Sequence, residues 1–439
     1  MAKSLVFTVR RQAAKLVPPA KSTPCVQLGL SDFDNNKGVR YQIENMLLYS
    51  RLEHATMIQR DPAMVMKEAL AQALVYYYPL AGRLREGSGS KLFVECTGEG
   101  ILFIEADADI TLQQLTNLVQ PPFSNFEEFL YNVPGSANII GCPLLLIQVT
   151  RLKCGGFVFA IRLNHVLGDA AGFGQFLVAV GELARGQKLS VEPVWKRELL
   201  NARDPPPTVT PHHESTNVSV DKTVLHSLFF GRTEVEALRK LVPQELQGCT
   251  MFDLMAACLW RCRTIALGIH PDDEVRLVIL MNALNKFQPP LPSGYYGNTA
   301  VTPSALSTAG KLCRNPLGYA VNLVMKAKRE VTEEYLRLLV LKGRPYITTE
   351  NNYFVSDLRN SGFSKIDIGW GKPCYGRALK CFEWESMFIP TKNERGEVGL
   401  MVPIWLSEPA MKVFQEELLS LLKHSSQQNH HCFNSKSSI

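Results

Sequence analysis

The stretch from Leu163 to Gly172 reads L-N-H-V-L-G-D-A-A-G and marks a change from strand to helix. The preceding run, Phe157 to Leu163, is rich in apolar residues as a buried strand is, whereas after Ala170 the apolar residues recur at helical spacing. A side chain at the end of a strand faces a cleft and is still held by a rigid scaffold. His165 lies at this junction, and histidine is the side chain best matched to proton transfer near neutral pH. The stretch therefore predicts an α/β unit that presents a candidate general base.

Asp169 stands directly before the predicted helix. An aspartate at this position commonly accepts hydrogen bonds from the first backbone N–H groups of the helix. We expect Asp169 to cap the helix in this way and to fix the turn that carries His165, with Gly168 permitting a tight turn. A histidine followed four residues later by an aspartate is by itself a weak catalytic pattern, so a purely structural role for both residues is the alternative.

The remainder of the chain alternates strands and helices in two halves. A length of 439 residues is too great for one core, so two domains are expected. The segment between the halves contains D-P-P-P-T-V-T-P, which excludes a helix interior or a central strand. The predicted parts are an N-terminal domain (1–189), a crossover linker (190–222), a C-terminal domain (223–425) and a disordered polar tail (426–439).

Individual elements are predicted from apolar periodicity and from stop signals such as Pro79. A hairpin through K-C-G-G is expected to join two strands of the first half. The predicted strands are Leu144–Leu152, Phe157–Leu163, Leu225–Phe230 and Val275–Met281, and the predicted helices include Val65–Tyr78, Thr233–Leu241 and Phe252–Ala266.

Composition excludes several classes of protein. The net charge of +6 includes no dense Lys/Arg tract with interleaved aromatic residues, so no nucleic-acid partner is expected. No apolar run reaches 18 residues and no signal peptide is evident, which predicts a cytoplasmic protein without membrane association, with a peroxisomal location as the alternative. The eleven cysteines form no C-x-x-C pair, so neither a disulfide framework nor a metal site is expected, and Cys258 and Cys262 are interpreted as buried thiols.

No nucleophile motif accompanies His165. The chain contains neither the G-x-S-x-G of serine hydrolases nor a P-loop. Instead, H-V-L-G-D at His165 resembles the H-x-x-x-D motif of the plant BAHD acyl-CoA-dependent acyltransferases, and D-I-G-W-G at Asp367 resembles their D-F-G-W-G motif. Further similar segments are Y-Y-Y-P-L-A-G-R-L at Tyr76 and G-Y-Y-G-N at Gly294. The likeness is greatest to the alcohol acyltransferase branch, which includes the benzyl alcohol O-benzoyltransferases.

The resemblance implies an α/β fold with mixed sheets, built of two chloramphenicol-acetyltransferase-like domains with a channel at their interface. It places His165 in the channel as the general base of a direct acyl transfer from acyl-CoA, with no acyl-enzyme. It implies structural roles for Asp169 and for the residues of the second motif, which are Asp367, Gly369, Trp370 and Gly371. It also implies that acyl-CoA is a co-substrate, that no cofactor stays bound, and that the protein is a monomer.

The same resemblance suggests a weaker set of substrate contacts. Ser356 is expected near the thioester carbonyl, and Thr250 stands at a position that resembles a CoA-contacting one. Arg239 and Lys240 could reach a CoA phosphate, and a solvated helix face is the alternative for these two residues. One departure is Leu284, which stands where an arginine partner of Asp169 is expected. Either Lys286 or another cation approaches Asp169, or backbone N–H groups at the helix start hold the carboxylate, and we favour the backbone donors.

The predicted function is transfer of a benzoyl or short-chain acyl group to the hydroxyl of a small alcohol. An alkaloid or other specialised-metabolite hydroxyl, or an amine, is the alternative acceptor. Outside this class, the alternative is a catalytically weak binding protein of the same fold, because Asp169 lacks the expected arginine.

Overall fold

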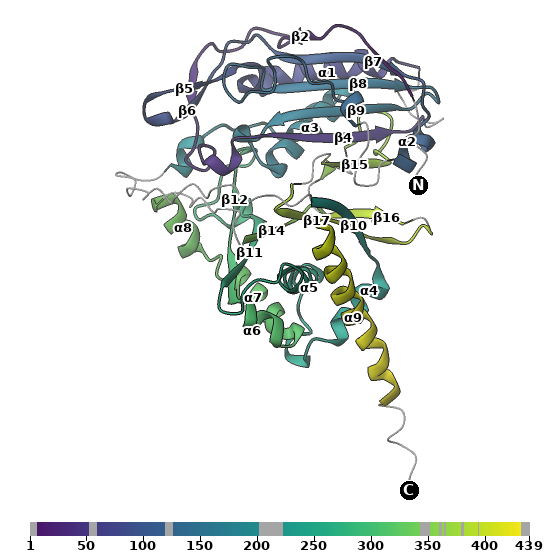
Figure 1. The fold of residues 1–439 in the computed structure, drawn as a ribbon. Coiled ribbons are helices and arrows are strands. Elements are labelled where there is room, and N and C mark those ends of the chain that lie inside the picture. Colours follow the sequence, from purple (N-terminus) through teal and green to yellow (C-terminus); the bar gives the residue numbers. More distant parts are fainter. Residues whose placement is uncertain are drawn as a thin grey trace.

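A computed structural model describes residues 7–431, except for 52–58, 119–125, 202–222, 343–351, 360–361, 364–365, 379–381 and 394. The chain forms two lobes, each built on a mixed sheet with helices packed against it (Figure 1). A small antiparallel sheet of β3 (Gln27–Gly29), β6 (Leu92–Glu95) and β5 (Arg83–Glu86) lies at the edge of the first lobe. The expected α/β architecture with mixed sheets is confirmed.

The first sheet has seven strands in the order β1-β7-β8-β9-β4-β15, with β2 also pairing β7. The strands are β1 (Val9–Arg11), β2 (Lys15–Val17), β4 (Gln42–Tyr49), β7 (Ile101–Ala108), β8 (Leu145–Leu152), β9 (Phe157–Asn164) and β15 (Tyr375–Ala378). Every residue of β9 is buried, because helices and loops cover both faces of the sheet. The predicted hairpin is confirmed, since β8 and β9 pair antiparallel around a turn that includes Gly155.

The second sheet also has seven strands, in the order β10-β17-β16-β14-β11-β12, with β13 pairing β11. The strands are β10 (Thr223–Phe230), β11 (Glu274–Asn282), β12 (Ala300–Val301), β13 (Ser304–Thr308), β14 (Asn352–Asp357), β16 (Glu385–Lys392) and β17 (Val398–Ser407). β14 lies parallel to both β11 and β16. The ends of these three strands reach the region between the lobes.

Helices cover the sheets of both lobes. α1 and α3 pack on the first sheet, and α5, α7 and α9 share the core of the second. The helices are α1 (Pro62–Tyr76), α2 (Leu112–Leu118), α3 (Ala170–Ala184), α4 (Arg232–Lys240), α5 (Met251–Ala266), α6 (Ala309–Arg314), α7 (Leu317–Arg329), α8 (Glu333–Lys342) and α9 (Glu408–His431). In the part of the chain that the structure describes, none is both long and apolar enough to cross a bilayer.

Two expectations about the organisation of the chain, the C-terminal tail and the domain boundaries, can be compared with the structure. α9 runs to His431, so the predicted tail boundary at residue 426 falls within this helix, and the disorder expected for the tail stays a prediction. Residues 432–439 lie outside the described residues. The domain boundaries at 189 and 223 stay predictions, but β15 pairs with β4 of the first sheet although it comes from the second half of the chain.

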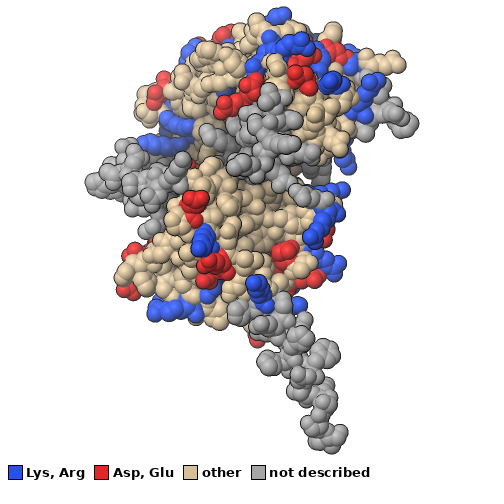
Figure 2. Space-filling view, turned by 45° about the vertical axis from the view of Figure 1, so that its right-hand side comes forward, with Lys and Arg blue, Asp and Glu red and all other residues tan. Residues whose placement is uncertain are grey.

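Local expectations about helix ends and thiols are met. Pro62 occupies the first turn of α1, and the Asp61 carboxylate accepts a hydrogen bond from Ala63 N at 3.1 Å. The helix ends at Tyr76, three residues before Pro79. Cys258 and Cys262 are both buried in α5, as predicted. On the face drawn in Figure 2, basic and acidic side chains are intermixed, as the small net charge leads one to expect.

Candidate active site

His165 lies where β9 ends and a single 3₁₀ turn (His165–Leu167) leads to α3. The backbone there is held from several sides. His165 N donates to the Tyr41 carbonyl at 3.0 Å, and the His165 carbonyl accepts from Asn298 Nδ2 at 2.9 Å. The side chain of Asn164 caps the turn by accepting from Val166 N at 3.2 Å. The imidazole is therefore presented by a fixed backbone, as a positioned base requires.

The Asp169 carboxylate is buried and accepts five hydrogen bonds. Its Oδ1 accepts from Ala171 N at 3.0 Å and from Gly172 N at 3.2 Å, which confirms the predicted helix cap. Its Oδ2 accepts from Thr299 N at 2.9 Å, Thr299 Oγ1 at 3.0 Å and Ala300 N at 3.1 Å. Asp169 thus joins the turn of His165 to a segment of the second half of the chain.

The arginine that the resemblance led us to expect at Leu284 is not needed here. Backbone N–H groups and one hydroxyl supply the donors that a buried carboxylate requires. Lys286, the suggested replacement cation, is exposed and takes no part in these five bonds. The missing arginine is therefore no argument for a weakened site.

Two glycines, Gly168 and Gly172, allow the backbone of Tyr296 to pass close to the turn that carries His165. A Cβ at Gly172 would lie 2.0 Å from the Tyr296 carbonyl oxygen, and a Cβ at Gly168 would lie 2.6 Å from the same atom. Gly168 has φ 171°, which is extended backbone. Gly168 does close the tight turn, since its N–H donates to the His165 carbonyl at 3.3 Å, but the turn does not need a left-handed backbone there. Its smallness is required because the backbone of Tyr296 passes against it.

We expect Asp169→Ala to lower the free energy of unfolding by about 2–3 kcal/mol, because a helix cap is lost and the buried N–H groups of Thr299 and Ala300 lose their acceptor. Asp169→Asn keeps one acceptor oxygen for the cap and should cost about half as much. Urea denaturation of the three proteins measures the difference. Full stability of both variants would contradict the role assigned to this carboxylate.

A buried ionic network beneath the site was not predicted from the sequence. Arg197 Nη1 lies 3.1 Å from Asp34 Oδ1, and both side chains are almost fully buried. Arg197 Nη2 donates to the Leu167 carbonyl at 2.8 Å, within the turn of His165. Asn298 donates to Asp34 Oδ1 from both its backbone and its side chain. Burial is the largest single influence on the pKa of Arg197 and lowers it, but the Asp34 carboxylate together with Tyr295 and Tyr296 outweighs burial and holds the pKa above its usual range.

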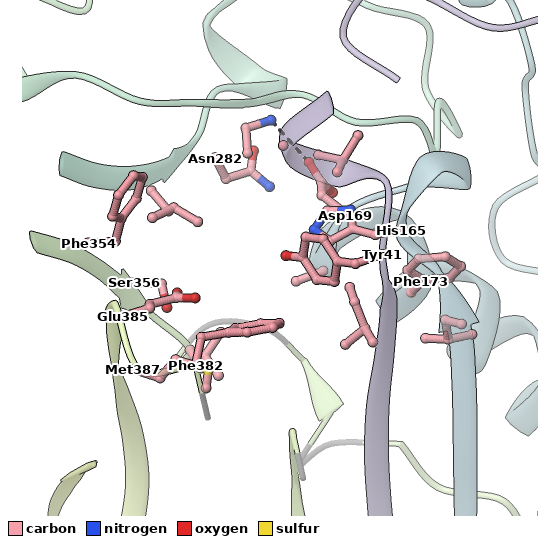
Figure 3. A pocket seen from close by; sticks show the side chains of 18 of the residues that line it. Tyr41, His165, Asp169, Phe173, Asn282, Phe354, Ser356, Phe382, Glu385 and Met387 are labelled. Carbon is pink, nitrogen blue, oxygen red and sulfur yellow. Dashed lines mark hydrogen bonds between the residues drawn. The ribbon is translucent and has the colours of Figure 1, made fainter. Parts of the chain in front are cut away.

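A cavity of about 240 Å³ opens beside His165 between the two lobes. It is lined from the first half by β4, the end of β9 and the start of α3, and from the second half by β11, β14 and β16. Figure 3 shows the imidazole and the Tyr41 ring on one side and Glu385 with Ser356 on the other. The Tyr41 and His165 rings meet edge to face at 5.0 Å between centroids. The wall also contains an aromatic cluster of Phe354, Phe382 and Trp384.

Ser356 and Glu385 are the buried polar groups of the opposite wall. Burial raises the pKa of Glu385 to about 6, and the nearby Ser356 hydroxyl opposes this rise. Ser356 was predicted as a site residue and does line the cavity. Glu385 was not predicted, although a carboxyl at the first position of the otherwise mostly apolar stretch E-S-M-F-I-P was a signal that could have identified it. Tyr41 carried no such signal.

The second motif lies in the core of the first lobe and not in this cavity. Trp370 is buried and packs edge to face on Phe157 at 5.1 Å. The Asp367 carboxylate accepts from Gly369 N at 2.8 Å and from Gly371 N at 3.0 Å, and both glycines have positive φ. The Asp367 carbonyl accepts a hydrogen bond from Arg185, just beyond α3. These contacts agree with a structural role for the motif.

The suggested CoA contacts lie at the junction of α4 and α5. Thr250 caps α5 by accepting from Asp253 N at 3.2 Å. Arg239 donates to the carbonyls of Gln247 at 3.0 Å and Cys249 at 3.1 Å, so its guanidinium stabilises the intervening loop. Lys240 is exposed. None of Thr250, Arg239 and Lys240 lines the cavity beside His165. Among the described ranges, no cluster of His, Cys, Asp and Glu is arranged to hold a metal ion.

Comparison with known proteins places this site in a family. The model of the Transferase family matches residues 7–421. This chain belongs to that family, the BAHD acyltransferases. It is 52% identical to a benzyl alcohol O-benzoyltransferase of Nicotiana tabacum, with 95% of each chain covered. It is 49% identical to alcohol acyltransferase 16 of Actinidia chinensis var. chinensis, with 94% of each covered.

The fold of this BAHD protein agrees with the solved structures. The crystal structure of vinorine synthase matches with a TM-score of 0.72 at 21% identity, over 94% of this chain and 98% of the other. The two-lobed α/β architecture of the family member is thereby established, and the chain is an enzyme of the acyltransferase type.

Proposed function

We propose that this enzyme transfers a benzoyl or short-chain acyl group from acyl-CoA to the hydroxyl of a small alcohol, with His165 as the general base. The observation that carries the proposal is the placement of His165, held by its backbone on both sides, at the wall of a largely apolar cavity between the lobes. The relatives named as a benzyl alcohol O-benzoyltransferase and an alcohol acyltransferase support the choice of donor and acceptor.

In the proposed reaction His165 takes the proton of the alcohol hydroxyl while the alcohol oxygen attacks the thioester carbonyl. The tetrahedral intermediate then collapses, and the imidazolium returns the proton to the departing CoA sulfur. Both substrates are bound together, so no acyl-enzyme is formed. Thr250, Arg239 and Lys240 stay proposed contacts of the CoA portion, outside the cavity that holds the reacting groups.

The developing oxyanion needs a hydrogen-bond donor. Ser356 was the candidate from the resemblance, but the adjacent Glu385 carboxyl argues against it, because a negative charge there would oppose the oxyanion. Tyr41 is better placed: its ring contacts His165, and its hydroxyl points into the cavity (Figure 3). We therefore propose Tyr41 as the oxyanion donor.

We expect Tyr41→Phe to lower kcat by about 100-fold, the scale for removal of one oxyanion donor. The KM for acyl-CoA should change little, because the interaction is made in the transition state. Ser356→Ala is the matched loss of a hydroxyl from the opposite wall and should lower kcat much less. Steady-state kinetics of both variants decide the question, and the reverse order of effects would restore Ser356 as the donor.

The function itself is tested with purified enzyme, a panel of acyl-CoA donors that includes benzoyl-CoA and acetyl-CoA, and a panel of alcohols and amines. Release of free CoA thiol that depends on the acceptor, with the ester identified by mass spectrometry, is the expected result. Binding of acyl-CoA without thiol release would favour the alternative of a binding protein. Amide products in place of esters would favour an amine acceptor.

A further inference from the structure

Glu385 is one of four acidic residues that line the cavity beside His165, with Glu44, Asp169 and Asp357. It is the first residue of β16 and lies opposite Phe354 of the parallel strand β14. Only 6% of its surface is exposed. Its carboxyl points into the cavity, across from His165 and Tyr41 (Figure 3). Met387, two residues further along the same strand, also lines the cavity and is apolar. An apolar residue would fit the position of Glu385 equally well for packing alone.

A buried carboxyl requires compensation for the water that it loses. The Ser356 hydroxyl lies close enough to oppose the shift, yet burial dominates and raises the pKa of Glu385. The ion pairs formed within the described ranges include Asp34, Asp253 and Asp357, but not Glu385. The carboxyl is directed at the cavity (Figure 3), where a bound molecule can donate a hydrogen bond to it.

We propose that Glu385 selects acceptors that carry, besides the hydroxyl that is acylated, a second hydrogen-bond donor such as a hydroxyl or an amine. The inference rests on the proposed function and names its acceptor class. The aromatic side chains of Tyr41, Phe382 and Trp384 flank the same space and suit a flat ring. The benzoyl and short-chain acyl groups of the donor have no N–H or O–H, so we assign the group that reaches Glu385 to the acceptor, in preference to the amide N–H groups of the CoA arm.

The test compares kcat/KM for benzyl alcohol with kcat/KM for its ring-hydroxylated and aminomethyl derivatives, at a fixed acyl-CoA concentration. For the wild-type enzyme we expect at least one derivative to be preferred by about tenfold or more, the scale of a hydrogen bond to a charged group. Glu385→Leu should abolish this preference and should raise turnover of benzyl alcohol. Because the measured quantity is a ratio within one protein, partial loss of folded enzyme does not change it.

Two further variants sharpen the result. Glu385→Gln keeps the volume of the side chain without its charge, so it should lose the preference for the aminomethyl derivative before any preference for the hydroxylated ones. This variant provides a second measurement if Glu385→Leu does not fold. Glu383→Leu makes the same substitution at an exposed position two residues away and should retain the wild-type ratio.

The possible outcomes distinguish failure of this inference from failure of the proposed function. Release of CoA with no acceptor-selective ratio, or a ratio that Glu385→Leu leaves unchanged, overturns the role of Glu385 alone. A preference that follows hydroxylation of the acyl group rather than of the acceptor also overturns it. If no alcohol in the panel supports CoA release, the proposed function fails and the inference fails with it.

Discussion

Replacing His165 with Ala is expected to lower kcat by about 10³-fold, within the range of 10²–10⁴ that a positioned general base contributes. The imidazole is half-buried at the cavity wall, and its loss opens no gap in either lobe core. The free energy of unfolding should therefore change by less than about 1 kcal/mol. The measurement is the initial rate of CoA release, with denaturant unfolding of the same preparation.

His270→Ala is the matched control, since His270 is exposed and lies in the turn before β11, away from the cavity. It should retain the wild-type rate. His165→Gln tests whether hydrogen bonding alone suffices, and it should be nearly as slow as His165→Ala because an amide cannot accept the proton. Near-normal turnover by either His165 variant would refute the general-base mechanism.

Features fixed by neighbouring residues were predictable from the sequence. The cap by Asp169, the hairpin through K-C-G-G and the buried thiols of α5 all depend on contacts within a few positions of the chain. Periodicity located the elements of the second half to within one or two residues, as for α5 and β11. The location of His165 followed from the strand that ends there and the helix that begins soon after.

Contacts between distant residues were not predictable. Arg197 and Asn298 meet Asp34 across 163 and 264 positions, and nothing in a proline-rich crossover distinguishes an arginine that is buried from one that is solvated. The pairing of β15 with β4 likewise depends on how the two halves assemble. The favoured prediction that backbone N–H groups at the helix start hold Asp169 is confirmed, but the further donors from residues 299–300 could not be predicted from a pattern of side chains.

The ionic network beneath His165 leads to the largest expected effect on stability. Arg197→Met should lower the free energy of unfolding by about 3–5 kcal/mol, because it leaves the Asp34 carboxylate buried without a cationic partner. The guanidinium also lies 4.4 Å from the Trp195 ring and 5.0 Å from the Tyr296 ring, contacts that methionine replaces only in part. Chemical denaturation measures the loss.

A second substitution separates loss of charge balance from loss of packing. In the double variant Asp34→Asn/Arg197→Met no charge stays buried, so most of the lost stability should return, and the double-mutant cycle should give a coupling of at least about 1–2 kcal/mol. Arg232→Met removes a highly exposed arginine paired with Glu236 and should cost no more than about 0.5 kcal/mol. Equal costs for Arg197→Met and Arg232→Met would show that the buried pair does not hold the turn of His165. A double variant no more stable than Arg197→Met would assign the cost to the ring contacts of Arg197 and not to its charge.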